Sequence, residues 1–424
     1  MQINNLLNRG MIEQISNYES IEKIFSEECV NIYVGFDPSA ESLHVGHLLP
    51  IKVLSYMQKM GHRPIILVGG GTGMIGDPSG RVSERQFLNE EKVKNNTLSI
   101  QNQLKRFFSF SGDNSAIIVN NLEWLNKINL ITWLRDVGKS FSINYMLSKD
   151  SVKIRLGERE QGISYTEFSY MLLQAYDFLQ LFDNYNCKVQ GGGNDQWGNI
   201  TAGIDLVRKL RQKEVFGITF PLLTTSSGEK FGKAAGNAVW LDASLTSPYH
   251  FYQYWLNVDD RDVKKLLKFF TDLSLEEIAN IMEHHIKNPE KRGAQRKLAD
   301  LITEYVHGLE EVSSAKMLTN FFFGGRINKI TKQDLLDILN MAPYFQLSNE
   351  SMKNGYSLVD VLVDTKICKG RGEAKKMILG GGIYLNNIQV KNIDYKISSE
   401  DLIAENYIIL RIGKKNYYLL EFLP

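Results

Sequence analysis

In the first half of the chain, short apolar runs bounded by glycine alternate with stretches of helical periodicity. The segments NIYVGF (31–36) and PIILVGG (64–70) are typical of buried strands, and the segment 47–61 between them is typical of a helix closed by glycine. Strand, helix and strand in this order form the unit of a parallel sheet. AIIVNN (116–121) and CKVQGGG (187–193) predict two further strands, so the predicted fold class is α/β with a Rossmann-like parallel sheet.

The pattern changes along the rest of the chain. After a sheet domain of residues 1–245, which contains a helical stretch from about 122 to 180, residues 246–323 are helical with charged faces and no strand signals. Residues 324–355 are mixed and polar, as in a linker. The last block, 356–424, combines a short basic helix with β-like runs separated by turn signals, which predicts a small α+β domain.

Composition limits the classes of protein that fit. Of the 424 residues, 43% are hydrophobic and 23% are charged, which is ordinary for a soluble globular protein, and the net charge of +1 leaves nucleic-acid binding to local basic patches. The three cysteines, at 29, 187 and 368, form no C-x-x-C pair and support neither a disulfide framework nor a thiolate zinc site. Without a signal-peptide pattern or a run of about 18 apolar residues, we expect a cytoplasmic protein that does not span a membrane.

Two histidines, His44 and His47, follow the first predicted strand at the start of the predicted helix. Their spacing is compatible with a zinc site, but the H-E-x-x-H form is absent and a third ligand would be needed. A second interpretation places both rings in the core. The third is anion binding, because the free N–H groups and the dipole at a helix start favour phosphate. Gly46 between the rings leaves the backbone open to a bulky ligand.

The second predicted strand runs into the glycine-rich stretch VGGGTGMIGDPSGRVSER (68–85). Three of its glycines match G-x-G-x-x-G, but Asp77 and Pro78 follow at once and break the helix that a dinucleotide fingerprint opens, so we reject a dinucleotide site. The glycines are instead predicted to turn the chain at the carboxyl edge of the sheet, with Asp77 facing the crevice. Arg81 and Arg85 either clamp phosphate there or are solvated.

A polar stripe interrupts an apolar helical segment. Tyr170, Gln174 and Asp177 fall at i, i+4 and i+7, so they share one helix face among apolar neighbours. The stripe either faces water or forms the wall of a pocket for a polar ligand, since buried polar groups need partners. Asp195 and Gln196, just past the end of the strand 187–193, favour the pocket.

The loop EKFGKAAGN (229–237) places Lys230 and Lys233 among glycines. Two compact charges on flexible stems suit transient contact with phosphates, although an ordinary exposed loop has the same composition.

Together, these motifs resemble the class I aminoacyl-tRNA synthetases, and among them the tyrosyl-tRNA synthetases of bacterial type. HVGH (44–47) resembles the HIGH signature and KFGKA (230–234) the KMSKS signature, while GDPSG, YMLLQAYDF and GGNDQWGN resemble tyrosyl motifs. The likeness extends from Tyr33 to the end of the chain. The sequence departs from the pattern at Ala234, where a serine or threonine is common, and has Pro50 near the helix start, where proline is tolerated.

The resemblance implies an enzyme that activates tyrosine with ATP, accompanied by magnesium, and transfers it to tRNA, with no protein-bound metal expected. It implies that the catalytic residues are His44, His47, Lys230 and Lys233. It implies that tyrosine is bound by Tyr33, Asp77, Tyr170, Gln174, Asp177 and Gln190. It implies that ATP is bound by Gly35, Asp37, Ser39, His44, Gly46, His47, Asp195, Gln196 and Lys233.

The remaining parts of the chain also resemble parts of this family. Residues 246–323 would be a helical anticodon-side domain, and an insertion at about 122–164 resembles the connective region that pairs subunits, which implies a homodimer, although an apolar helical face fits an internal core equally well. The block 356–424 resembles the small RNA-binding domain named after ribosomal protein S-four. In it, a candidate phosphate-binding patch or a merely solvated face is formed by Lys366, Lys369, Arg371, Lys375 and Lys376, against Glu373.

Two other hypotheses remain open at this point. A tryptophanyl-type synthetase would share the class signatures, but Tyr33 and Asp177 favour a hydroxyl-bearing substrate. A non-catalytic RNA-binding relative would share the fold, but the intact histidines and lysines favour catalysis.

Overall fold

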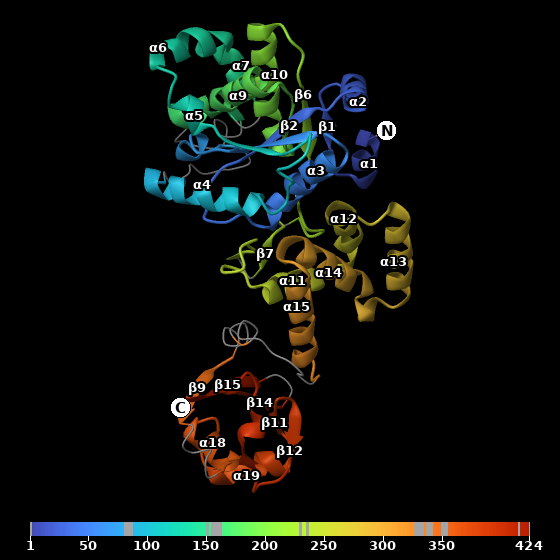
Figure 1. Cartoon of the computed structure of the whole chain (residues 1–424), viewed down its shortest axis with the longest axis vertical. Coiled ribbons are helices and arrows are strands. Elements are labelled where there is room, and N and C mark those ends of the chain that lie inside the picture. Colours follow the sequence, from blue (N-terminus) through green and yellow to red (C-terminus); the bar gives the residue numbers. More distant parts are fainter. Residues whose placement is uncertain are drawn as a thin grey trace. The chain divides into compact units, whose positions relative to one another are not determined.

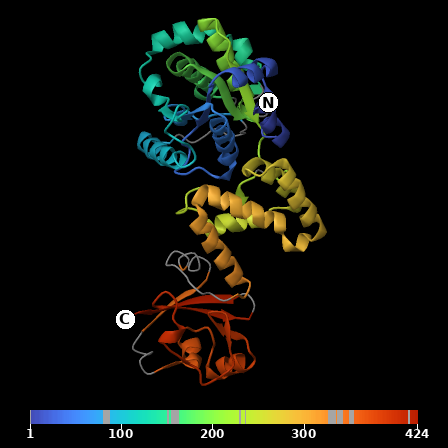
Figure 2. The same ribbon diagram turned by 45° about the vertical axis from the view of Figure 1, so that its right-hand side comes forward.

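The computed structural model describes residues 2–79, 88–149, 152–153, 163–228, 231–234, 237–325, 335, 342–348, 355–413 and 416–423. The chain divides into two compact units (Figures 1 and 2). The first unit comprises residues 1–246 and 254–302, and the second comprises 247–253 and 303–424.

A six-stranded sheet forms the centre of the first unit, in the order β1-β6-β5-β2-β3-β4. Its strands are β1 (Gln14–Ile15), β2 (Asn31–Phe36), β3 (Arg63–Val68), β4 (Ile117–Asn120), β5 (Cys187–Gly193) and β6 (Phe216–Phe220). All neighbours pair in parallel except β1, which is antiparallel to β6. The α/β class and the four predicted strands are confirmed. The apolar pattern did not single out β1, which has two residues, or β6, which a glycine interrupts.

Helices cover both faces of this sheet. They are α1 (Gln2–Arg9), α2 (Tyr18–Glu27), α3 (Leu48–Lys59), α4 (Glu90–Leu104), α9 (Tyr165–Tyr185) and α10 (Trp197–Arg211). Figure 1 shows α9 and α10 on one face and α3 and α4 on the other. Ser164 caps the start of α9 by accepting from the N–H of Glu167, and Asn186 ends the helix with φ of 48°. The predicted stop after α3 is confirmed at Gly61, where φ is 95°.

The stretch after β4 is built from short helical turns. They are α5 (Leu122–Leu125), α6 (Leu130–Thr132), the π-helical η3 (Trp133–Val137), the 3-10 turn η4 (Gly138–Ser140) and α7 (Ile143–Leu147). This confirms the helical pattern up to residue 149, while the rest of the predicted insertion lies largely outside the described residues.

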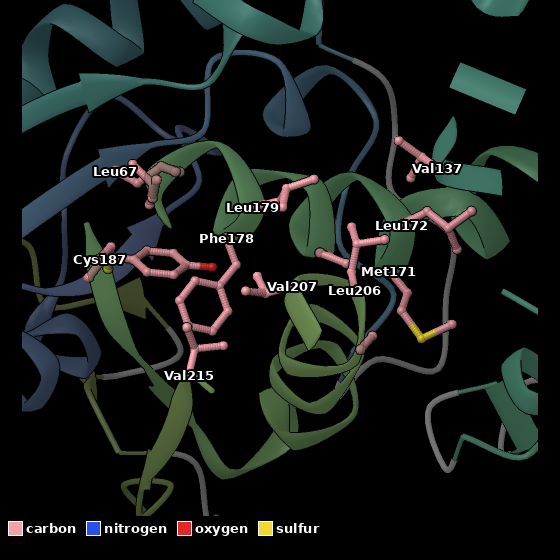
Figure 3. Close-up of a cluster of buried hydrophobic side chains, with 14 of the residues drawn as sticks. Leu67, Val137, Met171, Leu172, Phe178, Leu179, Cys187, Leu206, Val207 and Val215 are labelled. Atoms are coloured by element: carbon pink, nitrogen blue, oxygen red, sulfur yellow. The ribbon is translucent and has the colours of Figure 1, made fainter. Parts of the chain in front are cut away.

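The core of this unit lies between the sheet and the pair α9–α10. Figure 3 shows Phe178 of α9 beside Val207 of α10 and Val215, with Cys187 at the start of β5 nearby. These side chains are at most 3% exposed. Because full burial of a large apolar side chain stabilises a fold by about 1.5–3 kcal/mol, this packing fixes α9 against the sheet.

The structure confirms that the stretch after residue 246 is helical. The limits of a separate domain at 246–323 remain a prediction. The elements are α11 (Pro248–Leu256), α12 (Asp260–Phe270), α13 (Leu275–Lys287), η6 (Pro289–Lys291), α14 (Gly293–His307) and α15 (Leu309–Phe322). The division between the two units passes through α11 and α14. Ser274 and Glu277 form a capping box that begins α13.

The C-terminal part of the second unit contains a five-stranded sheet in the order β12-β11-β14-β15-β9. The elements of this part of the chain are β9 (Tyr344–Ser348), β10 (Tyr356–Ser357), α18 (Leu358–Asp364), α19 (Arg371–Leu379), β11 (Ile383–Leu385), β12 (Ile388–Val390), β13 (Lys396–Ile397), η7 (Ser399–Asp401), β14 (Tyr407–Ile412) and β15 (Asn416–Leu423). The strands β10 and β13 pair with each other in a separate two-stranded sheet. Asn386 and Asn387, with φ of 46° and 65°, form the tight turn between β11 and β12. Within the stretch predicted as a linker, β9 pairs in parallel with β15, so that stretch contributes a strand to this sheet.

A buried histidine makes the first unit sensitive to acid. The ring of His62 is 2% exposed, packs on Phe25 at 4.6 Å and accepts the N–H of Val30. Burial lowers the pKa of His62 from 6.5 to about 4. The unfolded chain therefore takes up a proton below pH 6.5 that the folded chain excludes, so the stabilisation is full above pH 6.5 and falls toward pH 4.

We expect the free energy of unfolding, measured with urea, to fall more between pH 7 and pH 5 in the parent than in His62→Gln, which cannot titrate. The difference between the two proteins should change by about 2 kcal/mol over this interval. A difference that stays constant with pH would show that His62 does not titrate as argued.

Candidate active site

A cavity of about 360 Å³ opens at the carboxyl ends of the central strands β2 and β5. This is where open parallel sheets bind ligands. Its lining includes ten residues that the sequence singled out, namely Tyr33, Gly35, Asp37, Gly46, His47, Asp77, Gln174, Asp177, Asp195 and Gln196. These residues come from β2, the turn before α3, the loop after β3, α9 and the segment after β5, so the fold brings together positions up to 163 residues apart in sequence, 196 − 33.

His44 and His47 belong to a 3-10 turn, η1 (Val45–His47), that leads into α3. The N–H of Gly46 donates to Nδ1 of His44 at 3.0 Å, and the N–H of His44 donates to Nδ1 of His47 at 3.1 Å. Each Nδ1 is therefore an acceptor, which leaves the proton of a neutral ring on Nε2. The ring centroids are 4.1 Å apart.

Burial keeps both rings neutral. It lowers the pKa of His44, and it lowers the pKa of His47 to about 3 with a further contribution from the nearby His44. Neutral rings with their outer nitrogens protonated are hydrogen-bond donors. Among the described residues, no group of three or more His, Cys, Asp or Glu side chains could hold a metal ion.

Gly46 has a local role that the sequence did not reveal. A Cβ at this position would lie 2.7 Å from Cε1 of His44, so any larger residue would displace the imidazole. The glycine is therefore required by the histidine ring itself as well as by access to the backbone.

Asp177, on α9, is 2% exposed and is held by two donors. Nδ2 of Asn121 donates to one carboxylate oxygen at 2.9 Å and Nε1 of Trp124 donates to the other at 2.7 Å. Burial raises the pKa of Asp177 to about 7, while these two hydrogen bonds act to lower it. The sequence analysis missed both donors. Asn121 directly follows a strand end, which is a usable signal, whereas nothing in the local pattern marked Trp124.

Asp37, just after β2, forms the second anchored carboxylate. The hydroxyl of Tyr170 donates to one oxygen at 2.8 Å and that of Thr72 donates to the other at 2.9 Å. Thr72 also accepts from Nδ2 of Asn121 at 2.9 Å, which links Asp37 to Asp177. Tyr170 therefore bonds to Asp37, although the sequence grouped it with Asp177.

Tyr33 is 2% exposed and lines the cavity from β2. Within the described residues, its hydroxyl oxygen has no hydrogen-bond partner, and the same holds for Oε1 of the buried Gln190 on β5. Burial, with the nearby Asp177, raises the pKa of Tyr33. A buried hydroxyl without a partner is costly, so a ligand that offers one would be favoured here.

A set of amides joins the other polar residues of the cavity. Nε2 of Gln196 donates to a carboxylate oxygen of Asp77 at 2.6 Å. Nδ2 of Asn199 donates to Oε1 of Gln174 and to Oε1 of Gln196, at 3.1 Å in each case. The N–H of Ser79 donates to the other oxygen of Asp77 at 2.9 Å. The predicted pocket wall is thus a connected network, in which Asn199 is the member that the sequence analysis missed.

Other predicted residues lie outside this network or outside the described residues. Ser39 is exposed and its N–H donates to the carbonyl of Asp37. Lys233 belongs to the short strand β7 (Lys233–Ala234), which pairs with β8 (Asn237–Ala238), but its side chain is not described. Lys230, Arg81 and Arg85 lie outside the described residues.

The five basic residues predicted to form a patch in the C-terminal block are exposed on and before α19, namely Lys366, Lys369, Arg371, Lys375 and Lys376. Arg371 pairs with Asp360 of α18 at 2.6 Å, and the N–H of Lys369 donates to Glu373. Because Asp360 neutralises one cation, the patch is less positive than the local sequence suggested. No helix among the described residues is long and apolar enough to cross a membrane.

Comparison with known families defines the class to which this fold and site belong. The family model "tRNA synthetases class I (W and Y)" matches residues 26–324, and the model "Tyrosine--tRNA ligase SYY-like C-terminal domain" matches residues 334–420. The fold and the site therefore define a class I tRNA synthetase of the tryptophan and tyrosine group.

Individual relatives narrow this class. The chain is 48% identical over 417 residues to the tyrosine–tRNA ligase of Bacillus velezensis, covering 98% of each chain. It is 46% identical to that of Roseiflexus castenholzii, covering 97% of each. A truncated mitochondrial tyrosyl-tRNA synthetase from Aspergillus nidulans is 35% identical with a TM-score of 0.69, over 76% of this chain and 94% of that one. The chain belongs to the tyrosine–tRNA ligase family of bacterial type, as its motifs predicted.

The hydrogen bonds to Asp177 lead to a testable prediction about the pKa of this side chain. Trp124→Phe keeps the aromatic packing but removes one donor to the carboxylate, so the charged form should lose stabilisation. We expect the pKa of Asp177, followed by carbon NMR of the labelled carboxyl group, to rise by about one unit or more. Trp133→Phe is the control, because Trp133 packs on Tyr176 instead. An unchanged pKa in Trp124→Phe would remove Trp124 from the set of groups that control Asp177.

Proposed function

We infer that the protein is a tyrosine–tRNA ligase that forms tyrosyl-adenylate from tyrosine and ATP and then transfers tyrosine to the 3′ end of its tRNA. The observation that supports this most directly is the pair formed by Tyr33 and Asp177. A buried hydroxyl with no hydrogen-bond partner among the described residues and a buried carboxylate held by two donors line one cavity, in a chain nearly half identical to tyrosine–tRNA ligases. Such a pair suits the phenolic hydroxyl of tyrosine.

We propose that selection of tyrosine follows from these polar groups. Tyr33 and Asp177 would bind the substrate hydroxyl, and phenylalanine would leave them unpaired at a cost of about 1–3 kcal/mol for each unsatisfied group. The ammonium group would be bound by Asp77, Tyr170 and Gln174, with Gln190 close by. The amide network around Asn199 supports this assignment, because it fixes Gln174 and, through Gln196, Asp77 before the substrate arrives.

We propose that the other side of the cavity binds ATP. The neutral rings of His44 and His47 would donate to phosphate oxygens, and Lys230 and Lys233 would neutralise charge on the triphosphate. The nucleotide itself would lie against Gly35, Asp37, Ser39, Gly46, Asp195 and Gln196. The orientation of both imidazoles through their Nδ1 atoms supports this role, because it fixes the direction of each Nε2 donor.

In the proposed reaction, the protein positions tyrosine and ATP and forms no covalent bond with either. A carboxylate oxygen of tyrosine attacks the α-phosphorus of ATP, the bond from that phosphorus to the bridging oxygen breaks, and pyrophosphate leaves in line. In the second step, a terminal ribose hydroxyl of tRNA attacks the activated carbonyl, loses its proton and releases AMP. We propose that magnesium enters with ATP as part of the substrate, bound mainly by phosphate oxygens.

We propose that the exposed basic residues around α19 contact the tRNA backbone, since lysine and arginine supply position and affinity on phosphates. The cytoplasmic location expected from the sequence stays a prediction.

We propose that two copies associate through the insertion. Its short helices expose large apolar side chains, with Leu130 at 67%, Ile131 at 70%, Leu134 at 48% and Ile143 at 61%. Such a gathering on one stretch is unusual for a surface that faces only water, and it matches the homodimer that the motifs implied.

Pyrophosphate exchange with each aromatic amino acid tests the proposed function. We expect exchange with tyrosine and none with tryptophan or without amino acid. In Asp177→Ala, tyrosine affinity should fall about tenfold or more, because the substrate hydroxyl loses its charged acceptor. Asp183→Ala on the same helix is the matched control, since Asp183 pairs with Arg211 at the surface. Exchange with tryptophan alone would favour the tryptophanyl alternative, and RNA binding without any exchange would favour a non-catalytic relative.

Sedimentation velocity tests the association. We expect the parent to sediment as a dimer and Ile131→Glu to shift toward monomer, because burying an unpaired carboxylate in an apolar interface is costly. Ile286→Glu on α13 is the control, as Ile286 is 73% exposed outside the insertion. A parent that remains monomeric at high concentration, or an Ile131→Glu variant that dimerises normally, would contradict the proposed interface.

A further inference from the structure

Within the described residues, a glycine of the segment that carries the second signature contacts the histidine turn. Gly232 has φ of 95°, and a Cβ there would lie 2.6 Å from Cγ2 of Val45 and 3.5 Å from the nitrogen of Gly46. The backbone of Gly232 therefore rests directly on the turn between His44 and His47. A displacement of Gly232 of even an ångström would either clash with this turn or open a gap beside it.

Main-chain hydrogen bonds tie the two segments together. The N–H of Val45 donates to the carbonyl of Val239 at 2.9 Å, and the N–H of Val239 donates to the carbonyl of Gly232 at 2.9 Å. Two residues away on each of these segments, the N–H of Leu241 donates to the carbonyl of Leu43 at 2.8 Å. The position of Gly232 and the position of the histidine turn are consequently coupled through continuous backbone contacts.

A side chain from α11 holds Gly232 in this place. The N–H of Gly232 donates to the hydroxyl oxygen of Tyr254 at 2.8 Å. The ring of Tyr254 is itself fixed, because it packs on Phe231 at 5.4 Å and on Trp255 at 5.3 Å between centroids. The hydrogen bond thus has a rigid acceptor on one side and a glycine in a left-handed conformation on the other.

A side chain from α12 holds the other end of the same segment. Asp262 is 8% exposed, and its Oδ2 accepts from the N–H of Ser226 at 3.0 Å and from the Ser226 hydroxyl at 3.2 Å. The carbonyl of Thr225 accepts from the N–H of Gly228 in the turn that follows. Ser226, which precedes Lys230, and Gly232, which lies between Lys230 and Lys233, are therefore two fixed points of the segment that bears the second signature.

We propose that Tyr254 and Asp262 are positioning residues for ATP activation, which hold Gly232 and Ser226 in register with the histidine turn. The proposal rests on the proposed function and adds two residues that lie outside the known signatures and line no part of the cavity described above. They act through Gly232 and Ser226, so their loss affects the ATP side of the reaction. The groups proposed to bind tyrosine are anchored by other residues, namely Asn121, Trp124 and Asn199.

The test separates ATP turnover from tyrosine binding in the full-length protein. Tyr254→Phe removes the acceptor for Gly232 but keeps the ring, and Asp262→Asn removes the charge that Ser226 contacts. In pyrophosphate exchange, we expect each variant to lose about three- to tenfold in kcat/KM for ATP, the range of one or two hydrogen bonds. The Kd for tyrosine, measured by calorimetry without ATP, should stay within about twofold, and the melting temperature within a few degrees.

Tyr56→Phe is the matched control, because the hydroxyl of Tyr56 also bonds to the main chain of this unit, donating to the carbonyl of Thr271 at 2.9 Å, away from both signatures. Its kcat/KM for ATP should equal that of the parent. Parent-like ATP kinetics in both Tyr254→Phe and Asp262→Asn would overturn the proposal, as would equal losses in tyrosine affinity and ATP turnover. A parent without tyrosine-dependent exchange would instead overturn the proposed function itself.

Discussion

Two anchored carboxylates, the buried Asp177 and the half-buried Asp37, impose the strongest constraint on this structure. Asp37 and Asp177 lie at the carboxyl end of the central strands, where a charge without donors would cost several kcal/mol. Each is held by two donors, and Thr72 and Asn121 connect the two sets. The constraint reaches the backbone as well. A Cβ at Gly69 would lie 2.2 Å from Oδ1 of Asp37, so the glycine-rich turn after β3 is needed to make room for a carboxylate.

Burial also changes the protonation of the histidines and of Asp177 in this site. It suppresses charge on His44 and His47, which makes them oriented neutral donors, and it raises the pKa of Asp177 to about 7. Groups of this kind are suited to binding and to stabilising charge that develops on a phosphate, with no need for a nucleophile on the protein. The cavity is thus lined in part by polar groups that hydrogen bonds hold in place.

The helices after the sheet contribute to this site without lining it. Tyr254 and Asp262 reach Gly232 and Ser226 by hydrogen bonds, while the backbone around Val239 pairs with the histidine turn. The two signature segments are almost 200 residues apart in sequence, 230 − 44 = 186. Their mutual position is therefore set by long-range contacts, and it depends on side chains that carry no signature of their own.

The sequence alone predicted the α/β class, the four central strands, the stop at Gly61 and ten of the residues that line the cavity. It could do so because strand ends of a parallel sheet converge at one edge, so a polar residue after an apolar run is marked locally. Only the tertiary structure decided that Tyr170 bonds to Asp37, that Asn121, Trp124 and Asn199 anchor the polar groups, and that Asp360 offsets Arg371. These are pairings between distant segments, and a hydrogen bond depends on distances of a few tenths of an ångström that no local pattern encodes.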